Sequence, residues 1–147
     1  MTPLCTVEEA NSYFEDTLTG LDWASEDETK KLLALKQATK IINNLNFKGE
    51  VSVAGQENCF PRGGDTEIPQ TIKEACADIA LALIQGIDPN VEAEIANYTA
   101  QTFTSAKIEK APARTPEWVY AGVPCQSAWI KLLRYLEDGM DITILRG

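Results

Sequence analysis

The side chains that could carry out chemistry are few in kind. The chain has 147 residues and no histidine, which removes the commonest general base, the commonest zinc ligand and the usual partner of a nucleophilic Ser or Cys. None of its four cysteines forms the Cys-x-x-Cys pair typical of zinc knuckles and thiol redox sites; they are Cys5, Cys59, Cys76 and Cys125. We expect reduced, mostly buried thiols, no metal or cofactor site and no enzymatic activity.

Carboxylates are the remaining candidates for catalysis, but several of them occupy positions at which an acidic residue stabilises the start of a helix. Thr6-x-x-Glu9 and Ser25-x-x-Glu28 both match a capping box, in which the acidic residue stabilises the first turn of a helix. The first pattern predicts a helix that ends near Gly20 and has an apolar stripe of Val7, Ala10, Phe14 and Leu18. The second predicts a longer helix whose stripe is Leu35, Ala38, Ile42 and Leu45.

The charge balance limits the possible partners. Thirteen Lys and Arg face 22 Asp and Glu, which gives a formal net charge of −9. Nucleic-acid binding depends on cations that neutralise phosphates, so this balance disfavours tight binding to DNA. Four lysines recur along the second predicted helix, where a solvated face explains them better than a phosphate-binding groove: Lys30, Lys31, Lys36 and Lys40.

Two targeting signals are missing from the sequence. No apolar run approaches the ~18–20 residues that cross a bilayer. The first residues also lack the basic segment, hydrophobic stretch and cleavage site of a secretory signal. We therefore expect no membrane contact, and a protein that is cytoplasmic or part of something assembled in the cytoplasm.

The middle of the chain is expected to be irregular and then strongly helical. Residues 51–53 lie between glycines, and proline and paired glycines within 60–65 argue against regular structure. A helix is predicted over 69–85, with the core stripe Ile72, Cys76, Ile79 and Leu83. Because Leu81 and Ile84 lie beyond this stripe, the helix must be buried on more than one side, either centrally in the domain or against a second subunit.

The region from 87 to 123 is the least regular. Residues 99–110 alternate loosely between apolar and polar side chains, as a half-exposed β-hairpin or arm does, and 111–116 form a stiff proline-containing linker. Trp118 and Tyr120 follow among turn residues, and they act either as lids on the core or as contact anchors.

The C-terminal part returns to helical spacing before it ends in a short tail. A last helix is expected from about Gln126, with Trp129, Leu132, Leu133 and Leu136 on one face. Residues 140–147 partly alternate, like a strand that joins another chain's sheet edge or fills its groove. The sequence thus predicts a mainly α domain over 1–139, a small bundle of about four helices with an extended β-hairpin or arm inserted at about 87–123, and an extended C-terminal docking tail over 140–147.

The order of these residues resembles a known family. The resemblance spans most of residues 6–136, and its motifs are Gln37-Ala38-Thr39, Phe47-Lys48-Gly49, Gln56, Phe60-Pro61-Arg62, Ile68-Pro69, Ile72-Lys73, the helix 74–83 and a Leu-rich last helix with Tyr135-Leu136. In this order they are similar to the head-to-tail connector (adaptor, head completion) proteins of tailed phages, which are often labelled DnaT-like single-stranded-DNA-binding proteins.

The resemblance implies a structural protein of the virion neck. It implies a homo-oligomeric ring, typically of about twelve copies, that docks under the portal protein, contacts a downstream tail or neck protein and continues the DNA channel. An acidic lumen would let genomic DNA slide through without specific binding. By position, the expected portal-docking residues are Ile142, Ile144, Leu145 and Arg146, and the expected inter-subunit or tail contacts are Leu81, Ile84, Trp118 and Tyr120.

The alternative is single-stranded DNA binding, as the family label suggests. That function requires aromatic side chains interleaved with basic ones along a groove. Trp118, Tyr120, Trp129 and Arg134 would supply part of such a groove. The acidic balance argues against it, and salt-dependent binding to an oligonucleotide would distinguish the two functions.

Overall fold

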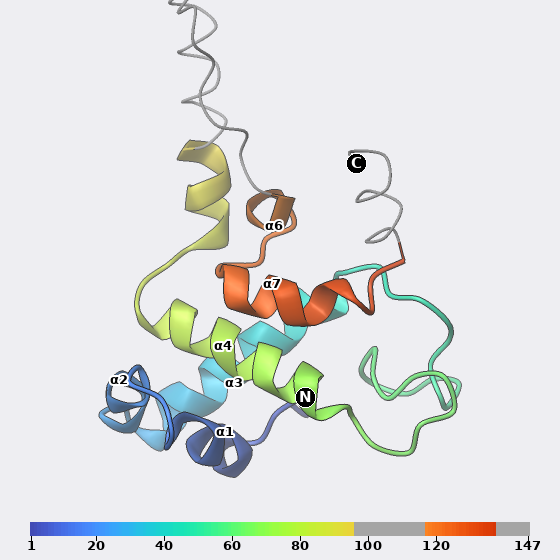
Figure 1. Cartoon of the computed structure of the whole chain (residues 1–147), viewed down its shortest axis with the longest axis horizontal. Helices are drawn as coiled ribbons and strands as arrows, with labels where there is room; N and C mark the ends of the chain where they lie inside the picture. The colour runs from blue at the N-terminus through green and yellow to red at the C-terminus, as the bar shows by residue number, and fades with distance from the viewer. Residues whose placement is uncertain (96–116, 138–147) are drawn as a thin grey trace, which may run out of the picture.

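The chain folds as a bundle of helices. The computed structural model describes residues 1–95 and 117–137, and within these ranges it contains no β-strand. The labelled helices are α1 (Val7–Phe14), α2 (Gly20–Ala24), α3 (Glu28–Asn43), α4 (Gln70–Ile84), α6 (Glu117–Tyr120) and α7 (Gln126–Leu133), and residues 89–95 are also helical. The predicted mainly α fold is therefore confirmed (Figure 1). The predicted hairpin residues 99–110 and the tail 140–147 lie outside the described ranges.

Helix α4 lies at the centre of the bundle, where it packs against α3 and α7 and also contacts α1 and α2 (Figure 1). Three of its four predicted core residues are fully buried, namely Ile72, Cys76 and Ile79, whereas Leu83 is only half-buried. The alanines between them are buried as well and allow the neighbouring helices to approach closely. Of the two alternatives for this helix, central burial within the domain accounts for most of its apolar surface.

Helix α1 begins as predicted but ends early. Thr6 and Glu9 form the reciprocal capping box, with each side chain bonded to the other's backbone N–H. The helix stops at Phe14, because the Thr17 hydroxyl donates to the Phe14 carbonyl at 2.9 Å and the chain turns away. The prediction that Leu18 belongs to the core stripe is wrong, since Leu18 is 92% exposed.

Helix α3 is the second place where a local pattern misleads. Its N-cap is Asp27, whose carboxylate accepts from the Lys30 backbone N–H at 2.7 Å, and not Ser25, whose hydroxyl donates to the Asp22 carbonyl. The predicted stripe is otherwise confirmed, with Leu35, Ala38 and Ile42 fully buried and Leu45 half-buried. The solvated face predicted for the lysines is wrong at Lys31, whose side chain is only 7% exposed.

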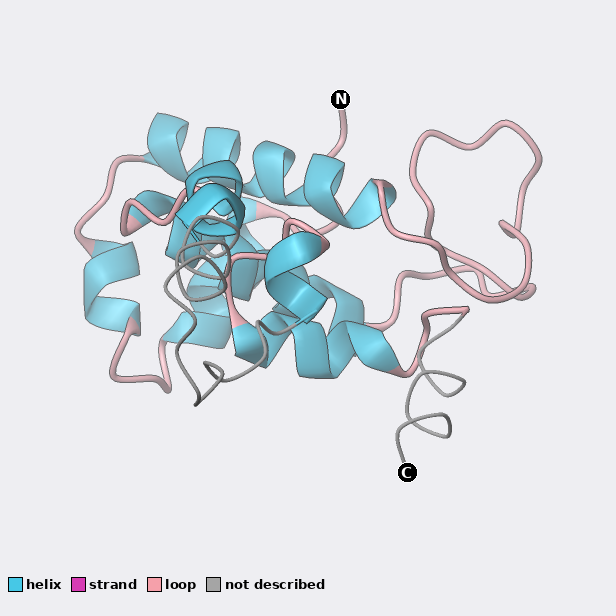
Figure 2. Cartoon of the chain, turned by 90° about the horizontal axis from the view of Figure 1, so that it is seen from above, coloured by secondary structure: helices cyan, strands magenta, loops and turns pink. Residues whose placement is uncertain are grey.

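The long connection between α3 and α4, residues 44–69, is irregular as predicted, yet one side chain organises it. The Arg62 guanidinium donates to four backbone carbonyls, those of Phe47, Lys48, Gly49 and Cys59. Phe60 is buried beneath, edge-on to Phe47 with ring centroids 4.8 Å apart. Both views show this connection projecting from one end of the helical body (Figure 1, Figure 2).

The C-terminal helices close the bundle. Helix α7 begins at Gln126 as predicted; Leu132 is fully buried, and an isolated antiparallel bridge joins Leu136 to Phe47. Within the predicted arm, 87–123, the regular structure of the described residues is helical, at 89–95 and in α6. Among the described residues, no helix has both the length and the apolar character needed to span a membrane.

Candidate functional site

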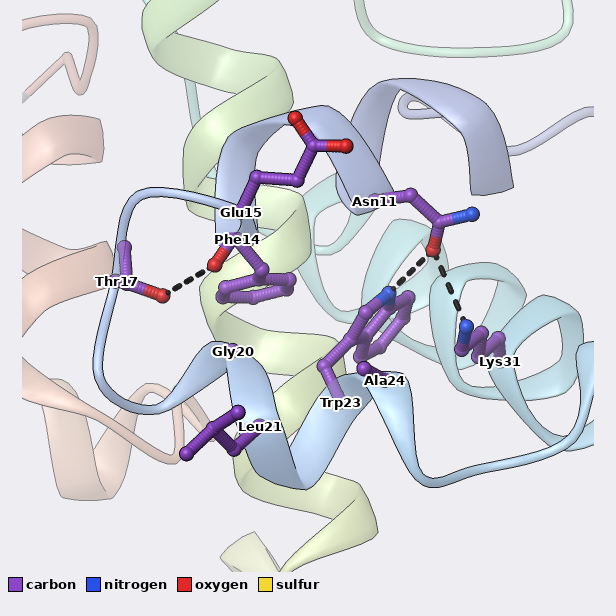
Figure 3. A pocket seen from close by; sticks show the side chains of 9 residues that line it. All are labelled: Asn11, Phe14, Glu15, Thr17, Gly20, Leu21, Trp23, Ala24 and Lys31. Atoms are coloured by element: carbon purple, nitrogen blue, oxygen red, sulfur yellow. Dashed lines mark hydrogen bonds between the residues drawn. The ribbon is translucent and has the colours of Figure 1, made fainter.

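An open hollow lies where α1, α2 and the start of α3 meet (Figure 3). It has a volume of about 400 Å³ and is lined by Asn11, Phe14, Glu15, Thr17, Gly20, Leu21, Trp23, Ala24 and Lys31. The shape depends on Gly20, because a Cβ at this position would lie 1.9 Å from the Phe14 carbonyl oxygen. Only glycine therefore allows α2 to start this close to the end of α1.

The floor of the hollow is aromatic. Phe14 and Trp23 are both buried, with ring centroids 5.1 Å apart, and Tyr13 extends the stack beyond Phe14. The Trp23 indole N–H donates to Asn11 Oδ1 at 2.8 Å, which satisfies its polar group and fixes the ring (Figure 3). The Trp23 ring is thus held in place by its hydrogen bond to Asn11 and its contact with Phe14.

A buried ammonium group adjoins these rings. Lys31 Nζ donates to Asn11 Oδ1 at 3.3 Å and lies 5.7 Å from the centroid of the Trp23 ring. Its acidic partner, Glu28, is 3.6 Å away and is itself 72% exposed. The buried Lys31 charge is therefore only partly compensated by Asn11, Trp23 and the solvated Glu28. A partner that brings a negative charge to this position would compensate it further.

Leucine side chains are exposed at the hollow and on the turn beside it. Leu21 is 76% exposed and lines the hollow, and Leu18, on the turn just before α2, is 92% exposed. An exposed leucine beside buried aromatic rings is typical of a protein-docking site, in which a partner's apolar groups are removed from water. The hollow therefore combines an exposed apolar side chain with buried rings and one ammonium group.

A second polar cluster lies inside the bundle and ties α1, α4 and α7 together. The Asp78 carboxylate accepts from Lys131 Nζ at 2.6 Å and from the Tyr13 hydroxyl at 3.0 Å. Burial opposes the charged form of Lys131, but its hydrogen bonds to Asp78 and Tyr13 outweigh that cost and raise the pKa of Lys131. Asp78 is only 10% exposed, so the cluster cross-links helices and offers little to a ligand.

The thiols are unpaired and protonated at neutral pH. Burial raises the pKa of Cys59 and of Cys76 to about 11, and it also raises the pKa of Cys5 and Cys125. A thiol in this state is a poor nucleophile, because the thiolate is the reactive form. The predicted burial of the cysteines agrees with the structure, in which two are buried and two half-buried.

The residues predicted for assembly are distributed over several environments. Leu81 is only 6% exposed and is covered by its own chain, while Ile84 is half-buried and still partly accessible. Trp118 is half-buried against the core, which agrees with a lid, and Tyr120 ends the short helix α6. The expected portal-docking residues Ile142, Ile144, Leu145 and Arg146 lie outside the described ranges.

The residues of the hollow were not predicted as a site. Asn11 is a polar residue inside an apolar pattern, and Gly20 was interpreted only as a helix end, although both position the hollow. The signal that could have found it is Gly20 followed by Leu21, a glycine and an apolar residue in a segment otherwise rich in turn and acidic residues.

The described residues thus form a small helical bundle with an open hollow at α1 and α2. A comparison with family models matches residues 3–110, well over half of the chain, to the family described as "Putative DnaT-like ssDNA binding protein". The chain belongs to this family. Comparisons with curated proteins and with solved structures gave no significant match.

Proposed function

We propose that this chain is a structural connector of a tailed phage, a subunit of the ring between the portal protein and the tail. The ring would contain about twelve copies, and genomic DNA would pass through it without specific binding. The single observation that carries the proposal is the α1–α2 hollow, which is lined by the exposed Leu21 and by the buried rings of Phe14 and Trp23. A surface of this kind is suited to a protein partner.

The distribution of charge supports a conduit. The chain carries a formal charge of −9, and three of its cations are held by contacts within the chain. Lys73 pairs with Glu9, Lys131 with Asp78, and Arg62 with backbone carbonyls. An acidic surface with few available cations releases few counterions from DNA, so the duplex would move along it without being held.

The hollow provides a direct test of the connector. We expect Leu18→Asp and Leu21→Asp together to abolish capture of the protein on immobilised cognate portal or on its neck partner, because each charge would be desolvated on docking. The melting temperature should stay within a few degrees of wild type, since both side chains are exposed. Ile130→Asp, at a 59% exposed position on α7, is the matched control. Normal capture of the double variant by both partners would contradict the proposal.

The second candidate function is single-stranded DNA binding, and the description of the family agrees with it better than with the connector. One feature of the fold also favours it. The bridge between Phe47 and Leu136 brings the exposed residues Lys48 and Arg134 to neighbouring backbone positions beside Tyr135. Two cations next to a partly exposed ring are the minimal elements of a backbone-tracking and base-stacking contact.

Fluorescence anisotropy with a labelled oligo-dT would decide between the two functions. A single-stranded DNA binder should bind at 50 mM salt, lose affinity steeply at 200 mM, and weaken further when Lys48 and Arg134 are changed to Glu. A connector should bind weakly under both conditions, and the same substitutions should have little effect. Tight binding that depends on these two residues would replace the connector as the proposed function.

A further inference from the structure

The loop that projects between α3 and α4 has no regular structure but is cross-linked by side-chain hydrogen bonds. Gln56 fastens its tip: the side-chain oxygen accepts from the Val53 N–H at 3.0 Å, and the side-chain nitrogen donates to the carbonyls of Asn58 and Pro61. Arg62 fixes the base of the loop through its bonds to backbone carbonyls. A loop held in one conformation loses little entropy when it binds, as recognition loops require.

The tip of this loop is apolar, and acidic residues flank it. Val53 is 64% exposed and Val51 is 37% exposed, so both apolar side chains contact solvent at the loop tip. Glu50 is exposed beside them and has no ion pair within the described residues. Over residues 47–67, four acidic residues face two basic ones, so the loop carries a net charge of −2. The loop tip therefore presents an apolar protrusion, Val51 and Val53, which we call the knob, surrounded by acidic residues.

A groove at the other end of the molecule has an apolar lining and one lysine, which complements the apolar and acidic loop tip. It encloses about 160 Å³ between the start of α3 and the end of α4 and is lined by Lys30, Leu33, Ala34, Gln37, Leu83 and Ile84. Leu33 is 60% exposed. A volume of this size accommodates one branched apolar side chain such as valine.

Helix α3, which forms one side of the groove, carries charge opposite to that of the loop, while Lys30, the charged residue that lines the groove, is itself paired with Glu26 at 3.1 Å. Helix α3 contains four lysines and one glutamate, a net charge of +3 in a chain whose total is −9. Lys36 and Lys40 follow Leu33 by three and seven residues, which places them on the same flank of the helix. Neither has an ion pair within the described residues, so both are available to a partner's carboxylates.

The positions of knob and groove suit a ring. Figure 1 and Figure 2 both show the loop at one end of the helical body, whereas the groove lies at the opposite end, where α3 begins and α4 finishes. We propose that the loop tip of one copy, Val53 with Glu50, docks into the α3–α4 groove of the next copy. Such a contact joins two different surfaces head to tail, the arrangement that generates cyclic assemblies when the rotation closes. It rests on the proposed connector function and names the interface of its ring.

The first test introduces charge on each side of the contact. Val53→Asp and Leu33→Asp should each lower the amount of ring seen by native mass spectrometry, with cognate portal present, by at least about tenfold. Ile130→Asp, an exposed position on another helix, should assemble like wild type. Each variant should melt within a few degrees of wild type, because all three side chains are exposed. Normal rings from either of the first two variants would overturn the interface.

The second test restores the contact. Glu50→Lys and the pair Lys36→Glu with Lys40→Glu should each weaken assembly, and a chain carrying all three substitutions should recover it. A photo-crosslinking residue at position 53 should attach to peptides from α3 or α4 of another copy. Crosslinks to other peptides, or no recovery in the combined chain, would overturn the proposal.

The results also distinguish failure of this interface from failure of the proposed connector function. If wild type forms rings that tolerate Val53→Asp and Leu33→Asp, the connector function stands and another surface forms the interface. If wild type forms no ring alone or on portal, the connector function fails and the interface fails with it.

Discussion

Removing the Asp78 carboxylate is the perturbation that most directly tests the packing of α1, α4 and α7. Asp78→Ala leaves the Lys131 ammonium and the Tyr13 hydroxyl without the partner they now reach at 2.6 Å and 3.0 Å. Breaking a buried ion pair by deleting one member costs ~3–5 kcal/mol. Lys131 is 24% exposed, so water recovers part of that loss and we expect about 2–3 kcal/mol.

Thermal and urea unfolding provide the assay. For a chain of this length a loss of about 2–3 kcal/mol corresponds to a fall in melting temperature of roughly 5–10 °C. Glu74→Ala is the matched control, because Glu74 lies one turn earlier on α4 and its carboxylate has only a long, exposed bond to Gln70. This control should change stability by less than about 0.5 kcal/mol.

A second substitution separates the ion pair from general damage. Lys131→Met removes the unpaired charge that Asp78→Ala leaves behind, so the double variant should be more stable than Asp78→Ala alone, with a coupling energy above about 1 kcal/mol. If Asp78→Ala melts like wild type, or if the two changes simply add, the cluster does not hold the three helices together.

Three further predictions concern the core, acid stability and the tail. Ile42→Asp should unfold the protein or cost at least ~3 kcal/mol by chemical denaturation, because Ile42 is fully buried on α3. Burial would raise the pKa of Glu9, but hydrogen bonds from Lys73 and Thr6 outweigh the effect of burial and lower that pKa. Ionised Glu9 therefore stabilises the fold at pH values above its unfolded pKa of about 4.5. This contribution is lost as the pH falls through the lower pKa of the folded state. Urea midpoints measured between pH 3 and 7 should thus fall less steeply for Glu9→Gln than for wild type, and parallel curves would refute this role. Deleting 140–147 should abolish attachment to portal with little change in melting temperature, and unchanged attachment would assign docking to another surface.

Short-range patterns predicted those elements whose cause is local. The capping box at Thr6 and Glu9 and the buried stripe through Leu35 and Ile42 depend on residues three to seven apart, and the structure confirms both. The same rule failed at Leu18, because a side-chain bond from Thr17 ends α1 before the fourth position of the stripe. A helical period shows which face is apolar and does not show where the helix stops.

The interior polar contacts could not be predicted because they join residues distant in the sequence. Asp78 meets Lys131 across 53 positions, and Asn11 meets Lys31 across 20. Each residue alone has the appearance of an exposed helix charge or a polar interruption, so Lys31 was assigned to a solvated face. The hollow could not be predicted for the same reason, since Leu21 meets Phe14 and Trp23 only after α2 has packed against α1.

The central claim is that this chain functions as a ring, and native mass spectrometry of the protein with its cognate portal tests it most directly. The connector function predicts a closed assembly of about twelve copies on the portal, at physiological salt and without nucleic acid. A chain that stays monomeric alone and with portal, while binding single-stranded DNA with steep salt dependence, would contradict it.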